Sequence, residues 1–205
     1  MELNPRTTAV IAVHLQGDIV GPAGAFAGFF RQQVVERDVL AKNHALLGAA
    51  RDAGAIVVYT RVAWQPDYSD LHVNSPLLGI VAQSGCLKEG SPLAEIVAEV
   101  APADGDQVVT HQRIGGFAGS GLHELLQSRG ITTTVFSGTA TNASVEGTAR
   151  VASDLGYRVV VVEDACSAAS PAAHQASIES LGLLAEITTV PELTAALAAT
   201  EGASR

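Results

Sequence analysis

Residues 132–162, TTTVFSGTATNASVEGTARVASDLGYRVVVV, decide the fold of this chain. The first five residues are β-branched or apolar, as in a buried strand that runs to Ser137, and a turn of small residues follows at 138–142. Helical spacing then runs from about Asn142 to Leu155 and stops at Gly156, where a second apolar strand begins. A strand, a helix and a strand in this order predict two parallel strands joined by a right-handed crossover.

The same alternation continues on both sides of this unit. Strands are predicted at residues 8–14, 55–61, 107–111, 132–137, 157–162 and 187–190. Helices are predicted at residues 34–53, 92–100, 120–128, 142–155 and 171–183. Segment 62–90, rich in Pro, Asp, Ser and Gly, is expected to form a long irregular loop, and such loops are more often functional than idle. The pattern predicts a three-layer α/β/α, Rossmann-like fold with a mainly parallel six-stranded sheet, as one domain over residues 1–205.

Composition excludes several classes of protein. Hydrophobic residues make up 47% and charged residues 16% of the chain, which provides a core and argues against disorder. The net charge of −9, with no run of Lys or Arg, argues against nucleic acid or anionic membrane as a partner. No apolar stretch reaches the ~18 residues that span a bilayer, and the first six residues lack the layout of a signal peptide. We therefore expect a cytoplasmic protein.

The sequence gives no sign of a metal or an organic cofactor. Cys86 and Cys166 have neither metal-ligand spacing nor the density of a disulfide scaffold. No Gly-x-Gly-x-x-Gly follows a predicted strand. A metal held by His14 and His111 would need a third ligand, and no spacing supports one. We expect neither a cofactor nor a metal.

Parallel sheets carry their sites beyond the carboxyl ends of the strands. This rule selects His14 after the first strand, His111 at the end of the third, and the turn after the fourth strand that leads to Ser144. Ser144 falls in the first turn of a helix, where free N–H groups and the helix dipole favour an oxyanion. Either imidazole would serve as the base that a serine hydroxyl needs. The structural alternatives are a serine favoured by the helix start and histidines that only form hydrogen bonds.

The three selected points carry a wider pattern. Residues 14–19 read His-Leu-Gln-Gly-Asp-Ile, and residues 111–122 read His-Gln-Arg-Ile-Gly-Gly-Phe-Ala-Gly-Ser-Gly-Leu. Residues 138–145 read Gly-Thr-Ala-Thr-Asn-Ala-Ser-Val, with Thr-Ala at 148–149 and Asp-Ala at 164–165. In order and spacing, over roughly residues 7–190, these segments resemble the isochorismatase-like hydrolase superfamily of nicotinamidases, isochorismatases and carbamoyl-amide hydrolases.

The resemblance implies a scaffold more directly than a mechanism. The superfamily's catalytic trio is Asp, Lys and Cys, and this chain has His14, His111 and Ser144 in those places. Some relatives, including the isochorismatase of phenazine pathways, lack the Cys and hydrolyse a vinyl ether with the Asp as acid, but this chain lacks that Asp as well. Members are commonly dimers or tetramers, so a homodimer or homotetramer is expected.

Candidate substrate-binding residues come from the same three segments and the long loop. Arg61 or Arg113 would hold a carboxylate, and Trp64 either lines a pocket or packs under the loop. The aromatic residues at 26, 29 and 30 either cover the site or contact a neighbouring subunit. The full set of predicted binding residues is Gln16, Arg61, Trp64, Tyr68, Arg113, Phe117, Thr139, Ala140 and Asn142.

These observations predict an enzyme of small-molecule metabolism. The leading hypothesis is a hydrolase of a small amide, ester or enol ether, with His14 and His111 as the acid–base pair and Ser144 as nucleophile or water-positioner. One alternative is a biosynthetic lyase, isomerase or cyclase that works by acid–base chemistry without a covalent intermediate. Another is a non-catalytic descendant that binds a ligand or a partner.

Overall fold

A computed structural model describes residues 1–199 and contains a six-stranded sheet of order β3-β2-β1-β4-β5-β6. All neighbouring strands in it are parallel. The strands are β1 (Thr8–Val13), β2 (Ile56–Val62), β3 (Gln107–His111), β4 (Thr133–Thr139), β5 (Arg158–Ser167) and β6 (Glu186–Thr188). The predicted parallel six-stranded sheet is confirmed.

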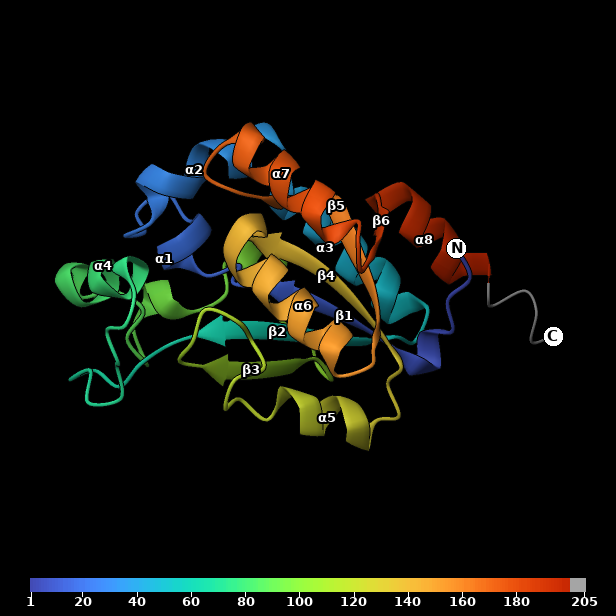
Figure 1. The fold of residues 1–205 in the computed structure, drawn as a ribbon, viewed down its shortest axis with the longest axis horizontal. Helices are drawn as coiled ribbons and strands as arrows, with labels where there is room; N and C mark the ends of the chain where they lie inside the picture. Colours follow the sequence, from blue (N-terminus) through green and yellow to red (C-terminus); the bar gives the residue numbers. More distant parts are fainter. Residues whose placement is uncertain (200–205) are drawn as a thin grey trace.

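Helices cover both faces of the sheet (Figure 1). The α-helices are α1 (Gly17–Val20), α2 (Ala27–Glu36), α3 (Val39–Asp52), α4 (Pro76–Ser84), α5 (Leu122–Ser128), α6 (Glu146–Asp154), α7 (Pro171–Leu181) and α8 (Val190–Ala199). Short helical turns are η1 (Pro5–Thr7), η2 (Pro92–Ala94), η3 (Ala98–Val100) and η4 (Thr141–Val145), the last a π-turn that continues into α6. No helix within residues 1–199 is long and apolar enough to cross a membrane.

Strand β1 is apolar throughout because helices pack against both of its faces. Val10 and Ala12 belong to the core cluster that includes Leu46 of α3 and Leu193 of α8. The alternate residues, such as Ile11, belong to the cluster formed with α5, α6 and α7. Side chains alternate between the two faces of a strand, so a strand buried on both faces reads as a continuous apolar run. Each fully buried Val, Leu or Ile contributes about 1.5–3 kcal/mol to this core.

The order of the strands creates a crevice between β1 and β4. From β1 the chain first builds outward through β2 and β3, and it then returns to place β4 on the other side of β1. Ligands of open parallel sheets bind where the strand order reverses in this way. Figure 1 shows α1, α2 and α4 gathered at the end of the sheet to which the arrowheads of β2 and β3 point. The crevice therefore lies under these helices.

The contact between β1 and β4 requires a glycine. Gly138 pairs with Val13 in the register of the two strands and has a φ of 112°. A Cβ at this position would lie 2.1 Å from the carbonyl oxygen of Val13. Only glycine adopts this conformation without strain and leaves room for the neighbouring backbone. Gly138 thus allows β4 to approach β1 just before the chain turns toward Ser144.

One loop prediction and one helix prediction need correction. Segment 62–90 is not wholly irregular, because α4 occupies residues 76–84 with the Ser75 hydroxyl accepting from Leu78 N at its start and Gly85 in the left-handed region at its end. The predicted helix 34–53 covers parts of two helices, because Asp38, with a φ of 52°, interrupts the helical backbone between α2 and α3.

Smaller differences concern the ends of elements. The segment 92–100 forms the turns η2 and η3 instead of one helix, because Ile96 between them pairs with Gln16 in an isolated bridge. Strand β5 continues to Ser167, five residues beyond the predicted end at Val162, where it pairs again with β4 past an irregularity between Phe136 and Gly138. Helix α8 follows β6 and was not predicted.

Candidate active site

Two histidines from separate strand ends meet in the interior. The Nε2 atoms of His14, just after β1, and His111, the last residue of β3, lie 2.9 Å apart and share a hydrogen bond. Their rings are stacked with centroids 4.9 Å apart. His14 has a φ of 52°, which is uncommon for a residue other than glycine. Its backbone N–H donates to the carbonyl oxygen of Thr60 at 3.0 Å. The left-handed residue therefore ends β1 beside β2, and the side chain of His14 meets His111 at the end of β3.

Burial keeps both imidazoles uncharged at neutral pH. Removal from water lowers the pKa of His14 well below its usual 6.5, and the neighbouring His111 lowers this pKa further. Burial lowers the pKa of His111 to about 4, although the backbone of Arg113 acts in the opposite direction. A neutral imidazole has one N–H and one lone pair, so a single proton lies between the two Nε2 atoms.

The position of that proton decides what His14 offers to a ligand. The two rings are joined only through their Nε2 atoms. Neither Nδ1 atom makes a hydrogen bond within residues 1–199. If His14 donates from Nε2, its Nδ1 carries a lone pair and is a base. If His111 donates, Nδ1 of His14 carries the proton and is an acid or hydrogen-bond donor. The two arrangements differ by the position of one proton along the bond and by the protonation of each Nδ1.

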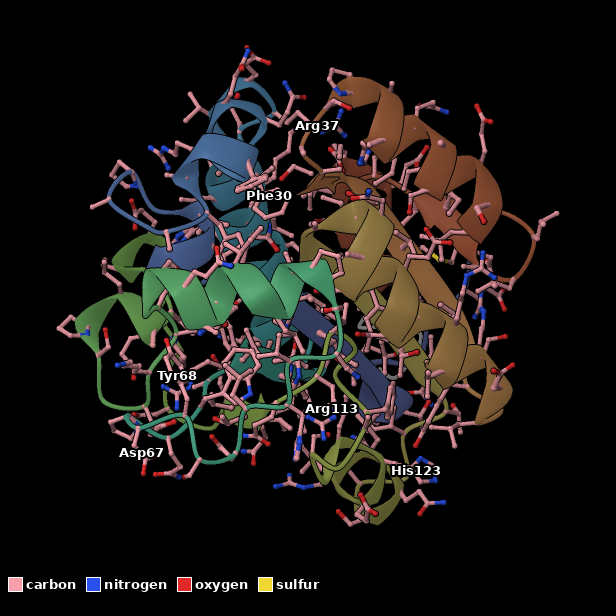
Figure 2. All side chains as sticks on the ribbon, turned by 60° about the vertical axis from the view of Figure 1, so that its left-hand side comes forward. Phe30, Arg37, Asp67, Tyr68, Arg113 and His123 are labelled. Carbon is pink, nitrogen blue, oxygen red and sulfur yellow. The ribbon has the colours of Figure 1, made fainter. Side chains whose placement is uncertain are left out.

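His14 lines a cavity of about 50 Å³ at the crevice between β1 and β4. The other polar side chains around the cavity belong to Arg113, Thr139 and Ser144. Most of the lining is apolar and includes Phe26, Phe30, Trp64, Leu77, Leu78 and Val81. In Figure 2, α4 lies across the front of this region, with Phe30 on one side of the helix and Arg113 on the other. A water needs about 10–15 Å³ of such space, so the cavity is large enough for a small ligand.

Ser144 reaches this cavity without contacting the histidine pair. It is buried in the π-turn η4 and lines the same cavity as His14. No hydrogen bond joins its hydroxyl to either imidazole within the described residues. The turn begins after the Thr139–Ala140 peptide bond, which is cis, and the N–H groups of Ala143 and Val145 both donate to the carbonyl oxygen of Ala140. In this structure the Ser144 hydroxyl therefore has no imidazole as a hydrogen-bond partner.

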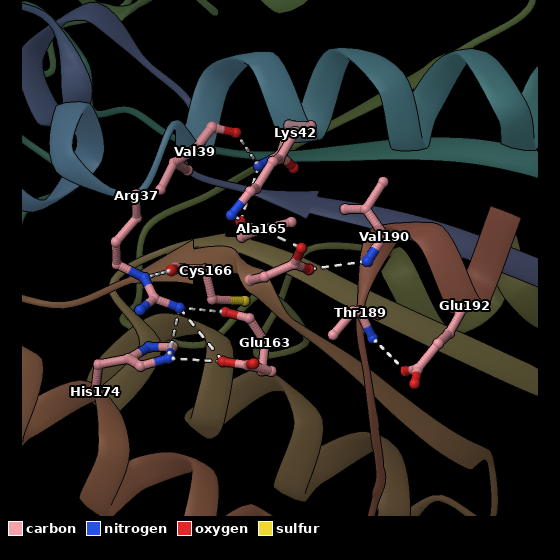
Figure 3. A network of polar contacts seen from close by, with 12 residues as sticks. Arg37, Val39, Lys42, Glu163, Ala165, Cys166, His174, Thr189, Val190 and Glu192 are labelled. Atoms are coloured by element: carbon pink, nitrogen blue, oxygen red, sulfur yellow. Dashed lines mark hydrogen bonds and ion pairs between the residues drawn. The ribbon is translucent and has the colours of Figure 1, made fainter.

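A partly buried network around Arg37, Glu163, Cys166 and His174 (Figure 3) connects to the turn through Thr141. Arg37 donates to the carbonyl oxygens of Cys166 and Glu163 at 2.9 and 3.0 Å and to Nε2 of His174 at 3.0 Å. A guanidinium has no acceptor, so Nε2 of His174 accepts in the shorter contact with Arg37 and Nδ1 then carries the proton, although Oε2 of Glu163 also lies 3.4 Å from this Nε2. Nδ1 then donates to the Thr141 hydroxyl at 2.9 Å. Burial and the positive charge of Arg37 lower the pKa of His174, which supports this neutral form.

The structure brings part of the predicted site together. His14, Ser144, Trp64, Arg113, Thr139 and Ala140 all line the cavity. His111 does not line it and contacts it only through His14. Trp64 is nearly fully buried, so its two proposed roles, lining a pocket and packing under the loop, are combined.

Five predicted binding residues do not line the cavity. The amide of Gln16 is held by Val62 and by the carbonyl oxygen of Ala94. Arg61 is paired with two glutamates. The Tyr68 hydroxyl donates to the carbonyl oxygen of Cys86, Phe117 stacks on Tyr157, and Asn142 is exposed.

Three of the residues that sequence reasoning missed come from one helix, α4. Leu77, Leu78 and Val81 of this helix cover the cavity. A signal for the helix was present, because Ser75 followed by Pro76 is a typical helix start and Gly85 a typical end. Phe26 and Phe30 line the cavity as well, which agrees with their expected role as a cover.

Comparisons with known proteins agree with this architecture. Residues 8–192 match the family model of the isochorismatase domain. An uncharacterized isochorismatase family protein of Escherichia coli O157:H7, YecD, is 32% identical over 201 residues, which is 96% of this chain and 100% of the relative. A cysteine hydrolase from Pseudomonas syringae pv. phaseolicola 1448A superposes with a TM-score of 0.88 at 28% identity, covering 97% of this chain and 96% of that one.

A second solved structure, an isochorismatase family protein from Desulfovibrio vulgaris, has a TM-score of 0.82 and 31% identity, covering 94% of this chain and 99% of the other. The fold, with its crevice at the switch point, defines a three-layer α/β protein. The chain belongs to the isochorismatase family. It lacks a cysteine at position 144, where it carries a serine.

Proposed function

We propose that this protein is a hydrolase of a small amide, ester or enol ether, with His14 as the group that transfers protons to and from the substrate. One observation carries this proposal: His14 lines the cavity with Nδ1 unpartnered among the described residues, while its Nε2 is held by His111. An imidazole oriented through one nitrogen and free at the other is suited to general acid–base catalysis. Membership of a generally hydrolytic family supports the same reaction class.

In the proposed reaction of an amide or ester, Nδ1 of His14 accepts a proton from a water as the water oxygen bonds to the carbonyl carbon. The carbonyl oxygen becomes an oxyanion, which N–H groups at the start of the η4–α6 helix stabilise. The proton on His14 then passes to the leaving amine or alkoxide as its bond to carbon breaks. Ser144 holds the water or the carbonyl group by a hydrogen bond, and His111 steadies His14 throughout.

A substrate screen with matched variants tests the proposal. We would incubate the purified protein with short-chain amides, esters and vinyl ethers and measure product release by NMR. The comparison uses His14→Gln, and the control is His123→Gln, because His123 lies on α5 and bonds Tyr157, away from the cavity. Turnover by wild type and the control but not by His14→Gln supports the proposal. Equal turnover by wild type and His14→Gln for every substrate contradicts it.

A second candidate is an acid–base lyase or isomerase without a covalent intermediate. The observation that favours it is the size of the cavity, which at about 50 Å³ leaves little room for a water beside a substrate. In such an enzyme the histidine pair would remove a proton from carbon and return it elsewhere. Reactions in D₂O separate an isomerase from an amide or ester hydrolase, since only the isomerase places deuterium on carbon in its product. Enol-ether hydrolysis also places deuterium on carbon, but it is recognised by the release of two products, an alcohol and a carbonyl compound.

A further inference from the structure

One side chain in the cavity wall has unused hydrogen-bonding capacity. Arg113 is half-buried, and its Nη1 donates to the carbonyl oxygen of Gln112 at 2.9 Å. Its Nε and Nη2 have no hydrogen-bond or ion-pair partner within residues 1–199. Because the pKa of His14 is lowered by burial, Arg113 carries the charge in an otherwise uncharged lining. A guanidinium stays protonated and binds carboxylates through two parallel hydrogen bonds.

The other candidate arginine has no such capacity. All three nitrogens of Arg61 are used, with Nε donating to the Thr110 hydroxyl and the two Nη atoms to Glu95 and Glu89. Arg61 is also absent from the cavity wall. Of the two arginines that the sequence offered for a carboxylate, the structure leaves only Arg113 available.

The protein's own carboxylates near the cavity are already engaged. Glu89 and Glu95 are bound by Arg61. Asp18, next to the cavity-lining Ile19, accepts from the N–H of Leu87 at 2.7 Å and from that of Ala25 at 3.4 Å. No acidic side chain lines the cavity within the described residues. Arg113 therefore has no acidic partner among the described residues and is available to an anion from outside.

We propose that Arg113 binds the carboxylate of the ligand, so that the substrates of this site are small apolar monocarboxylates that carry the amide, ester or enol-ether group. The substrate class rests on the proposed function, whereas carboxylate binding itself does not require hydrolysis. The carboxylate pairs with Nε and Nη2 of Arg113, the apolar body lies against Trp64 and the leucines of α4, and the reactive group faces His14 and Ser144. The cavity size limits the body to a few carbon atoms.

The chain contains its own reporter for this test. Trp64 is its only tryptophan, lines the cavity and has an indole Nε1 without a hydrogen-bond partner in the described part of the chain. A ¹H–¹⁵N spectrum therefore shows one indole cross-peak, which reports on the cavity. The two probes are butyrate and 1-nitropropane, an uncharged molecule of nearly the same shape. Neither is hydrolysed, so the titration measures binding alone.

We expect butyrate to bind about tenfold more tightly than 1-nitropropane, which corresponds to one charge-assisted contact. Arg113→Gln should bring the two dissociation constants within about twofold of each other. Arg113→Lys should keep an intermediate preference for butyrate, because lysine keeps the charge but lacks the two parallel N–H donors of the guanidinium. The matched control is Arg129→Gln, which removes the same charge from an exposed position outside the cavity. It should keep the full preference.

Three results would overturn the carboxylate proposal. They are equal affinity of the two probes in the wild type, an unchanged preference in Arg113→Gln, and an indole peak that butyrate does not move at about 0.1 M. Failure of the hydrolase proposal gives a different result. In that case the preference for butyrate and its dependence on Arg113 persist, while no amide, ester or vinyl ether is turned over.

Discussion

His14 and His111 are joined by their Nε2 atoms at 2.9 Å, and of the two only His14 lines the cavity. The histidine remote from the cavity thus acts through the one that lines it. This relationship assigns different roles to two residues that the sequence presented as an equal acid–base pair. His14 is the candidate catalytic residue, and His111 is a positioning residue that holds the ring and influences its pKa.

Replacement of His111 should change the pH profile as well as the rate. In the wild type, kcat/KM should stay level as the pH falls through 6.5, because the pKa of His14 is well below that value and the base form persists. His111→Gln removes one of the two causes of the lowered pKa, so the acid limb should move up toward pH 6.5. The rate should fall about tenfold, against about 10²–10⁴-fold for His14→Gln.

The measurement is kcat/KM against pH for wild type, His111→Gln and the control His123→Gln. A purely structural role for His111 would lower the rate of folded enzyme without moving the acid limb. An unmoved limb in His111→Gln would therefore contradict the positioning role.

Stability should fall as the pH is lowered toward 5. The pKa of His111 is about 4 in the folded protein and about 6.5 in the unfolded chain, so the unfolded chain binds more protons between these values. The stabilisation is complete above pH 6.5 and is lost as the pH falls from 6.5 to about 4. Between pH 7.5 and 5 the loss from His111 should be about 2 kcal/mol, and His14 acts in the same direction.

Urea unfolding at the two pH values checks this expectation. His111→Gln, which cannot titrate, should show a clearly smaller difference in the free energy of unfolding between pH 7.5 and 5. An equal pH dependence in the two proteins would show that protonation of the histidine pair does not drive the loss.

Ser144→Ala should reduce activity without abolishing it. The Ser144 hydroxyl makes no hydrogen bond to either imidazole, so no base is in place to activate it as a nucleophile. Loss of one hydrogen bond of about 1 kcal/mol to water or substrate predicts a rate decrease of about five- to tenfold. Mass spectrometry of the working enzyme should detect no acyl-enzyme. A trapped adduct on Ser144, together with complete loss of activity in the variant, would instead establish covalent catalysis.

The position of the site could be predicted from the sequence because strand order and local pattern determine it. Apolar runs ending at His14 and His111, and a small-residue turn before Ser144, place all three at the carboxyl edge of a parallel sheet. The hydrogen-bond partners that keep Gln16 and Arg61 out of the cavity wall could not be predicted in this way. The partners of Gln16 are Val62 and Ala94, 46 and 78 residues further along the chain, and only the folded structure shows that they occupy its amide.

Helix α4 shows a second limit of sequence reasoning. Its start and end signals are present, but they lie inside a segment whose Pro, Asp, Ser and Gly content is typical of a loop. The helix is short and apolar on the side that covers the cavity, so its pattern is hard to distinguish from that of a loop that packs on a core. Its role as a cover depends on a cavity whose other walls include His14, Val62 and Phe30, residues distant from it in the sequence.

The close approach of β4 to β1 should make Gly138 one of the positions least tolerant of a side chain. In Gly138→Ala the new Cβ would meet the carbonyl oxygen of Val13, and the residue would also have to keep a φ of 112°. The conformation alone costs about 1–3 kcal/mol, and the contact with rigid backbone adds to it. We expect a loss of at least about 3 kcal/mol in the free energy of unfolding.

Gly156→Ala separates these two effects. Gly156 has a φ of 89°, but a Cβ added to it would meet no atom of the described residues within 4 Å, so this variant carries the conformational cost without the collision. It should lose only about 1–2 kcal/mol. Urea unfolding of both variants measures the difference, which is the energy of the contact between the strands. If the two variants lose the same stability, then β4 is free to move away from β1, and the rigid crevice inferred at the switch point would not exist.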